Sequence, residues 1–195
     1  RVQLATNAYA PIAKNVFGTK SLDTKTRLDF AWSLVFSRLF YNVHLWSRMQ
    51  NKAVKCLNTS YMRVLRRIAD DVRYKGPVQH DVEIRLLLGA PSIECVFRVN
   101  RLLYMSRLAR NAPQALKVLL QNGAKNCLPW VTLIQGDLQA LYNSNPSKFE
   151  HMPSPDVNPE AWVDVMMSSH AEWKLLVKSS LAYSDSNCDV TVPAE

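Results

Sequence analysis

Residues 46–68, WSRMQNKAVKCLNTSYMRVLRRI, carry the clearest helical pattern of the chain and largely decide its fold. At about 100° per residue, the apolar side chains of this stretch fall on one face of an α-helix. They are Trp46, Met49, Ala53, Leu57, Tyr61, Val64 and Ile68. The opposite face, within about 80° of arc, carries Arg48, Lys52, Lys55, Thr59, Arg63 and Arg66. The stretch therefore predicts an amphipathic helix that packs its apolar face inward and exposes a basic stripe about 30 Å long.

The sequence before this stretch is also helical in pattern. Residues 8–17 predict a short helix stopped by Gly18. Residues 21–46 predict a second helix, for which Ser21 is the expected N-cap. Because apolar residues leave this second helix little polar surface, we expect it to be central and buried.

Helical spacing continues through the rest of the chain, in residues 79–88, 92–113, 113–123, 129–143 and 160–183. The sequence shows neither sustained period-two alternation nor an internal repeat, so it predicts an all-α fold, a bundle of about six to eight helices with irregular, Pro-rich connections. The expected organisation is a basic helical region, a helical connector, a Pro-rich linker, and a C-terminal helix or helix pair with a frayed acidic tail. Their ranges are residues 1–75, 76–142, 143–159 and 160–195.

Charge is unevenly divided along the sequence. Residues 1–125 hold 21 Lys and Arg against 7 Asp and Glu, whereas residues 126–195 hold 3 against 9. Such asymmetry is typical of a chain whose basic part meets a polyanion, although a merely soluble basic surface would give the same count.

Several function classes find no support in the sequence. The four cysteines are widely spaced and form no C-x-x-C motif, which argues against a zinc site or a disulfide framework and favours a reducing, intracellular compartment. The four histidines are isolated, and no nucleotide-loop or hydrolase motif occurs. The longest apolar run, residues 30–36, is too short to cross a bilayer. No signal peptide opens the chain, and a start at Arg1 suggests a piece of something longer.

Asp70 and Asp71 raise one catalytic possibility, because polymerases bind Mg²⁺ with adjacent carboxylates. Here the pair follows a long helical register instead of a strand pattern. Arg66 and Arg67 each precede one aspartate by four residues, the spacing at which helix side chains pair. We therefore interpret the two aspartates as a helix end and expect no metal or other cofactor in this chain.

Residues 24–71, TKTRLDFAWSLVFSRLFYNVHLWSRMQNKAVKCLNTSYMRVLRRIADD, resemble the segment just after the palm in reverse transcriptases of non-LTR (LINE-type) retrotransposons. In that family a Lys and an SLV-SRL-YN---W run lead into a helix ending Y-R-LR-I. The likeness continues through residues 81–110, which look like the helical connector after the thumb, and more loosely through 129–142 and 162–183. In all it covers most of residues 8–183.

The resemblance implies that residues 1–75 are a thumb, which with the connector holds the template-primer duplex for the palm of the same parent chain. The family's catalytic aspartates, its Mg²⁺, its nucleotide-binding residues and its endonuclease belong to regions outside this sequence. The chain alone is therefore expected to lack enzymatic activity, while its parent would be an RNA-directed DNA polymerase working in the cytoplasm or nucleus. Cys188 has no partner for the family's downstream zinc module.

The leading hypothesis is a non-catalytic grip on the backbone of RNA or of an RNA–DNA hybrid, with no membrane and no small-molecule substrate. The expected contacts are Arg48, Lys52, Lys55, Arg63 and Arg66. Five phosphate contacts predict a log–log salt slope of about −4 on a duplex. One alternative is a helical protein-interaction or structural domain. Another, a nuclease or polymerase using Asp70 and Asp71, predicts Mg²⁺-dependent activity that Asp70→Asn abolishes.

Overall fold

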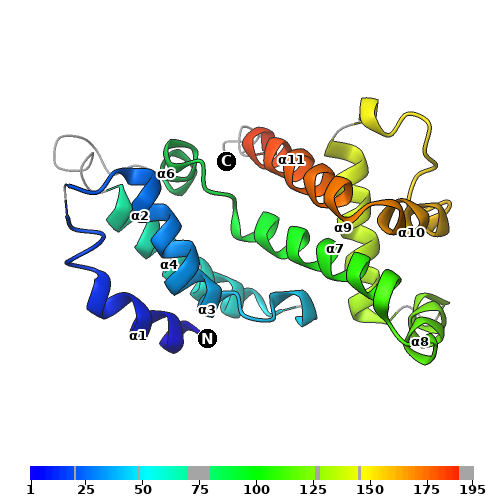
Figure 1. The fold of residues 1–195 in the computed structure, drawn as a ribbon, viewed down its shortest axis with the longest axis horizontal. Coiled ribbons are helices and arrows are strands. Elements are labelled where there is room, and N and C mark those ends of the chain that lie inside the picture. Colours follow the sequence, from blue (N-terminus) through cyan, green and yellow to red (C-terminus); the bar gives the residue numbers. More distant parts are fainter. Residues whose placement is uncertain (20, 48, 70–79, 126–127, 145, 189–195) are drawn as a thin grey trace. The chain divides into compact units, whose positions relative to one another are not determined.

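The protein is described by a computed structural model over residues 1–19, 21–47, 49–69, 80–125, 128–144 and 146–188, with all side chains in these ranges except those of residues 119–121, 123–125, 159–160 and 181–188. Helices and short connections make up these residues and no strand occurs among them, which confirms the all-α prediction (Figure 1). The chain forms two compact units. Unit 1 comprises Arg1–Asn42 and Met49–Ile93, and unit 2 comprises Val43–Arg48 and Glu94–Glu195.

Unit 1 consists of helices that pack around α4 (Figure 1). They are α1 (Val2–Ile12), α2 (Thr24–Phe30), the π-helix η1 (Ala31–Phe36), α3 (Ser37–Leu39), α4 (Asn51–Ile68) and α6 (Asp81–Leu88). The predicted first helix begins earlier than expected, at Val2, and contains Pro11 in its last turn. Gly89 ends α6 in the left-handed conformation, with φ of 59°, as its sequence predicted.

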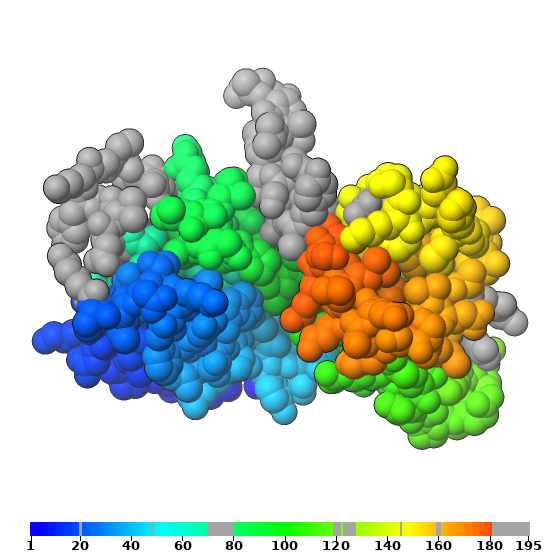
Figure 2. Space-filling view, turned by 45° about the horizontal axis from the view of Figure 1, so that its top comes forward, coloured from blue at the N-terminus to red at the C-terminus, as the bar shows by residue number. Residues whose placement is uncertain are grey.

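The run α2–η1–α3 is the expected central helix, with two differences. Asp23, and not Ser21, is its N-cap and accepts a hydrogen bond from the Thr26 amide. Phe30 and Leu34 are 41% and 40% exposed, so the expectation of burial all round was wrong. This run packs against α1, α4 and, through α2, α6, and these neighbours leave Phe30 and Leu34 partly in water. In the space-filling view, part of unit 1's blue surface belongs to this run (Figure 2).

Aromatic rings fill the centre of unit 1. The rings of Phe36 and Tyr61 lie 4.8 Å apart, and Trp32 and Phe40 surround them at centroid distances of 5.0 to 6.2 Å. The Tyr61 hydroxyl donates a hydrogen bond of 2.8 Å to the Pro91 carbonyl. This bond satisfies the one polar atom of a side chain that is completely buried.

Unit 2 contains the 3₁₀ turn η2 (Val43–Leu45) and, after Ile93, the rest of the chain (Figure 1). Its helices are α7 (Ile93–Asn111), α8 (Gln114–Lys125), α9 (Pro129–Ser144), the 3₁₀ turn η3 (Pro146–Lys148), α10 (Pro159–Ser168) and α11 (His170–Cys188). Pro129 and Pro159 each begin a helix, where a missing N–H costs nothing.

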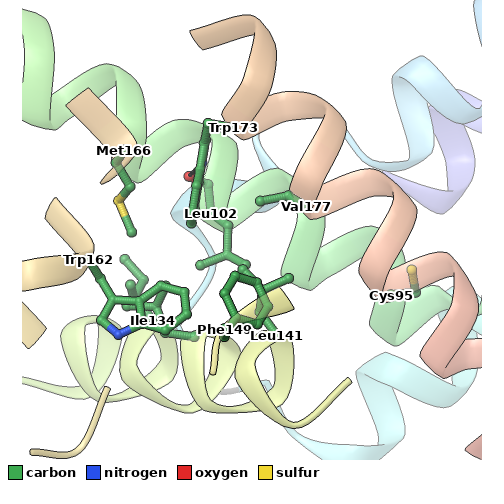
Figure 3. Packing of buried hydrophobic residues seen from close by; sticks show 10 residues of the cluster. Cys95, Leu102, Ile134, Leu141, Phe149, Trp162, Met166, Trp173 and Val177 are labelled. Carbon is green, nitrogen blue, oxygen red and sulfur yellow. Dashed lines mark hydrogen bonds between the residues drawn. The ribbon is translucent and has the colours of Figure 1, made fainter. Parts of the chain in front are cut away.

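The core of unit 2 forms where α7, α9, α10 and α11 meet, around two tryptophans (Figure 3). Trp162 and Trp173 are almost completely buried. The Trp173 indole donates a hydrogen bond of 3.2 Å to the Leu102 carbonyl, and the Trp162 indole donates one of 3.0 Å to the Pro153 carbonyl. Both indole N–H groups are thus satisfied within the apolar cluster.

The Pro-rich segment 143–159 is irregular, as its composition indicated, but it does not connect two domains. Phe149 from this segment is 2% exposed and lies 5.1 Å from the Trp162 ring. Ser154 donates a hydrogen bond to Gln139 of α9. The segment therefore packs as part of unit 2, because Phe149 has a place in the core.

The boundary expected between residues 75 and 76 lies outside the described residues and stays a prediction. Contacts within the chain place Val43–Arg48 and the residues after Ile93 in unit 2. A helix that is apolar enough and long enough to cross a bilayer does not occur in the described part of the chain.

Candidate nucleic-acid interface

Helix α4 positions three exposed cations on its outer side. Its buried residues are Leu57, Tyr61, Met62, Val64, Leu65 and Ile68. Lys52, Lys55 and Arg63 are exposed, and they lie within about 80° of arc on the side away from this apolar face. From Lys52 to Arg63 the row extends about 17 Å along the helix axis. Among the residues that the structure describes, no carboxylate pairs with any of the three.

Arg63 is held against α1. Its guanidinium carbon lies 5.6 Å above the centre of the Tyr9 ring, and Tyr9 in turn stacks on Phe17 at 5.8 Å. Such a cation–π contact orients the guanidinium but leaves its N–H groups free to donate. A shallow hollow of about 300 Å³, counted with its open mouth, lies beside Arg63 and includes the Thr6 and Ser60 hydroxyls in its lining.

Arg66, which was expected to contact phosphate, has a partner inside unit 1. Its guanidinium forms an ion pair with Asp81 at the start of α6. The arginine's charge is therefore balanced at that point, and the arginine joins α4 to α6. Local sequence patterns could not predict this pair, because its two members lie 15 residues apart on different helices.

The predicted start of the amphipathic helix, at Trp46, was wrong. Helix α4 begins at Asn51, since Gln50 has an extended backbone with ψ of 144°. Trp46 instead belongs to unit 2, where its ring lies 6.0 Å from that of Phe97. Ala53, assigned to the buried face, is exposed. Arg48 lies outside the described residues, so the observed row is shorter than expected.

The charge of the sequence divides with the two units. Unit 1 contains 14 Lys and Arg against 6 Asp and Glu, whereas unit 2 contains 10 of each. The whole net charge of +8 therefore belongs to the unit that contains α4. A polyanion approaching the protein is attracted to unit 1 before any specific contact forms.

In the described residues, carboxylates, histidines and cysteines form no candidate metal centre. Asp70 and Asp71 lie outside the described residues, and in the remainder no three His, Cys, Asp or Glu side chains gather as metal ligands would. Asp81 pairs with Arg66, and Glu83 accepts a hydrogen bond from the His80 amide in the capping box of α6. These two acids thus have structural roles in unit 1.

In unit 2, the carboxylate of Asp137 has a structural role. Asp137 of α9 is 4% exposed and accepts two hydrogen bonds from Arg101 of α7, of 2.5 and 2.8 Å. Arg98 adds a longer ion pair to the same carboxylate, at 3.9 Å. Two arginines of α7 are thus paired inside unit 2 with a carboxylate of α9.

Comparison with known proteins gives no relative. No protein-family model, curated protein or solved structure matches the chain.

Proposed function

We propose that unit 1 binds the sugar–phosphate backbone of nucleic acid through Lys52, Lys55 and Arg63, and that the chain is a non-catalytic part of an RNA-directed DNA polymerase. The observation that carries the binding proposal is the row of three exposed cations on the outer side of α4, opposite a fully packed face. The polymerase assignment is supported by the resemblance of residues 24–71 to the thumb segment of LINE-type reverse transcriptases.

The dimensions of the row suit a duplex. Double-stranded nucleic acid of B form carries about one phosphate charge per 1.7 Å of axis, so the length of the row corresponds to about ten phosphates. Lysine ammonium groups on flexible stems and one oriented guanidinium can contact such a backbone without reading bases. We expect binding with little sequence preference, and we propose the RNA–DNA hybrid as the ligand.

The test replaces the three cations of α4 and measures how the affinity for nucleic acid depends on salt concentration. Fluorescence anisotropy of a labelled RNA–DNA hybrid gives the binding constant of the full chain over a series of salt concentrations. In the triple variant Lys52→Gln, Lys55→Gln, Arg63→Gln, the log–log slope should become shallower by about 2.7, because three counterion-releasing contacts are lost. The slope of about −4 predicted from the sequence counted five contacts. The test counts only three, because Arg66 is paired with Asp81 and Arg48 lies outside the described residues.

A matched control removes the same charge from the same unit. Lys14, Lys25 and Arg38 are exposed in unit 1 and do not belong to α4. Their replacement by Gln should change the slope much less than the α4 variant does. Equal slopes for the two variants, with both folded by circular dichroism, would show that only net charge matters and would remove the α4 interface.

A second candidate, a protein-interaction domain, is favoured by one observation. Leu86 and Leu87 are adjacent on α6 and 58% and 53% exposed. Apolar side chains in water are typical of a surface that another protein covers. If the α4 variant stays folded and binds the hybrid as tightly as the unchanged chain, this second candidate is preferred.

The polymerase assignment has a separate test in the parent gene. It predicts an aromatic-x-Asp-Asp motif in the reading frame upstream of Arg1, within a strand–turn–strand pattern. An intact upstream frame without such a motif would contradict the assignment and leave the binding proposal standing.

A further inference from the structure

Unit 2 has its own cluster of cations, where the end of α7 meets the beginning of α11. The Arg110 guanidinium donates a hydrogen bond of 2.7 Å to Nδ1 of His170, and another to the Ser106 hydroxyl. A guanidinium has donors only, so Nδ1 of His170 must accept with its lone pair. The neutral imidazole therefore carries its proton on Nε2, where a further acceptor can bind it.

Two more cations stand one helical turn from this bond. Arg107 precedes Arg110 by three residues on α7, and Lys174 follows His170 by four residues on α11. Both side chains are exposed, and within the described part of the chain neither forms an ion pair. Glu172 lies about 200° around α11 from His170, so it points to another side of the helix.

The electrostatics of the cluster are those of an unbalanced positive site. The pKa of His170 is lowered by desolvation first and then by the charges of Arg110, Arg107 and Lys174. The described charged groups that shift this pKa are therefore all cations. Desolvation and then Arg107 also lower the pKa of His44, whose ring lies 4.2 Å from that of Tyr104. The Trp130 indole fixes this neighbouring segment by donating a hydrogen bond of 2.8 Å to the His44 carbonyl.

We propose that Arg107, Arg110, Lys174 and His170 form a binding site for a phosphate group on unit 2. Cations that repel one another with no carboxylate to balance them are stabilised by an anion, and guanidinium groups match the geometry of phosphate oxygens. The Nε2–H of His170 supplies one more donor. This site stands on residues of unit 2 alone and does not depend on the α4 interface.

The phosphate can belong to a phosphodiester backbone or to a free phosphate monoester, and the experiment separates the two. The ring signals of the histidines in the full chain are followed by NMR at constant pH and ionic strength. One arm adds inorganic phosphate, and the other adds a single-stranded oligonucleotide. Either ligand should shift the His170 ring signals, because Nε2–H then donates to a phosphate oxygen and the bound anion offsets the charges of the neighbouring cations. The signals of His151, which is exposed and not part of the cluster, should stay in place.

Variants assign the response to the proposed residues. In Arg107→Gln, Lys174→Gln, the phosphate-dependent shift of His170 should be lost. The control Lys117→Gln, Lys148→Gln removes the same charge elsewhere in unit 2 and should keep the shift. The triple α4 variant should also keep the response to inorganic phosphate, so that failure of one proposal is distinguishable from failure of the other.

The outcomes divide clearly. A shift with inorganic phosphate supports a site for free phosphate groups, and a shift with the oligonucleotide alone supports a site for backbone phosphodiesters. No shift with either ligand overturns the proposal, as does an equal shift when chloride replaces phosphate at the same ionic strength.

Discussion

The buried ion pair of Arg101 and Asp137 shows how strongly single residues can affect the stability of unit 2. Arg101 is 8% exposed and Asp137 is 4% exposed, and two hydrogen bonds join their side chains. Burial raises the pKa of the Asp137 carboxyl, and the hydrogen bond and charge of Arg101 oppose that rise. Two charges removed from water in this way are tolerable only together.

Replacing Asp137 by Asn should therefore be strongly destabilising. The free energy of unfolding should fall by about 3–5 kcal/mol, because the variant leaves the Arg101 charge buried without its counterion. Urea denaturation of the full chain measures the change. The control Glu94→Gln breaks an ion pair whose carboxylate side is 68% exposed, and it should cost less than about 1 kcal/mol. A similar small cost for Asp137→Asn would mean that the buried pair contributes no more than a surface pair.

The two histidines near Arg107 predict a dependence of stability on pH. Their pKa values in the folded chain are lowered from the ordinary 6.5 by desolvation and by neighbouring cations. As pH falls through 6.5, the unfolded state takes up these protons first, so the free energy of unfolding should decrease toward acid pH. Urea titrations at several pH values on both sides of this point measure the slope. The variant His44→Gln, His170→Gln should flatten it, and His151→Gln should not; an unchanged slope in the double variant would contradict the assignment.

At the scale of the element, α4 shows what periodicity predicts well. Leu57, Tyr61, Val64 and Ile68 are buried as the pattern indicated, because four apolar residues at helical spacing fit only one face. The pattern failed at the N-terminal end. Residues 46–50 continue the same periodicity, yet Trp46 packs with Phe97 in unit 2 and the helix begins at Asn51. A local pattern cannot show which of two apolar surroundings a tryptophan will join.

The buried face of α4 should contribute most of the stability of this helix. Leu65 is completely buried, so Leu65→Ala should lower the free energy of unfolding by about 2–5 kcal/mol. Ala53 is exposed, and Ala53→Ser should change it by less than about 0.5 kcal/mol. Thermal or urea unfolding of both variants tests this. If Ala53→Ser were the more harmful change, the orientation of α4 described above would be incorrect, and so would the exposure of its cations.

At the scale of the whole molecule, charge is divided unequally between the two units. Unit 1 carries 14 Lys and Arg against 6 Asp and Glu, while unit 2 is balanced at 10 of each. Long-range attraction of a polyanion therefore acts on one unit, and the unit 2 cluster offers at most a local contact.

This division predicts unequal effects of charge removal on duplex binding. The α4 triple variant should reduce the log–log salt slope for the hybrid by about 2.7, and removal of three cations from unit 2 should reduce it by less than half of that. Lys117, Lys148 and Lys178 serve for the second variant. Anisotropy titrations over the same salt range compare the two. A larger loss of slope in the unit 2 variant would show that the main contact surface lies on unit 2 and would contradict the proposal.

The sequence by itself determined the helical class, most helix positions and the identity of the cations on α4, because these follow from local spacing, caps and breakers. Only the tertiary structure decided which cations remain available. Arg66 is paired with Asp81, Arg63 is oriented by Tyr9, and Arg110 binds His170 from 60 residues away. The physical reason is that the charge of a side chain is a property of its residue type, whereas its partner depends on which helix the fold brings beside it.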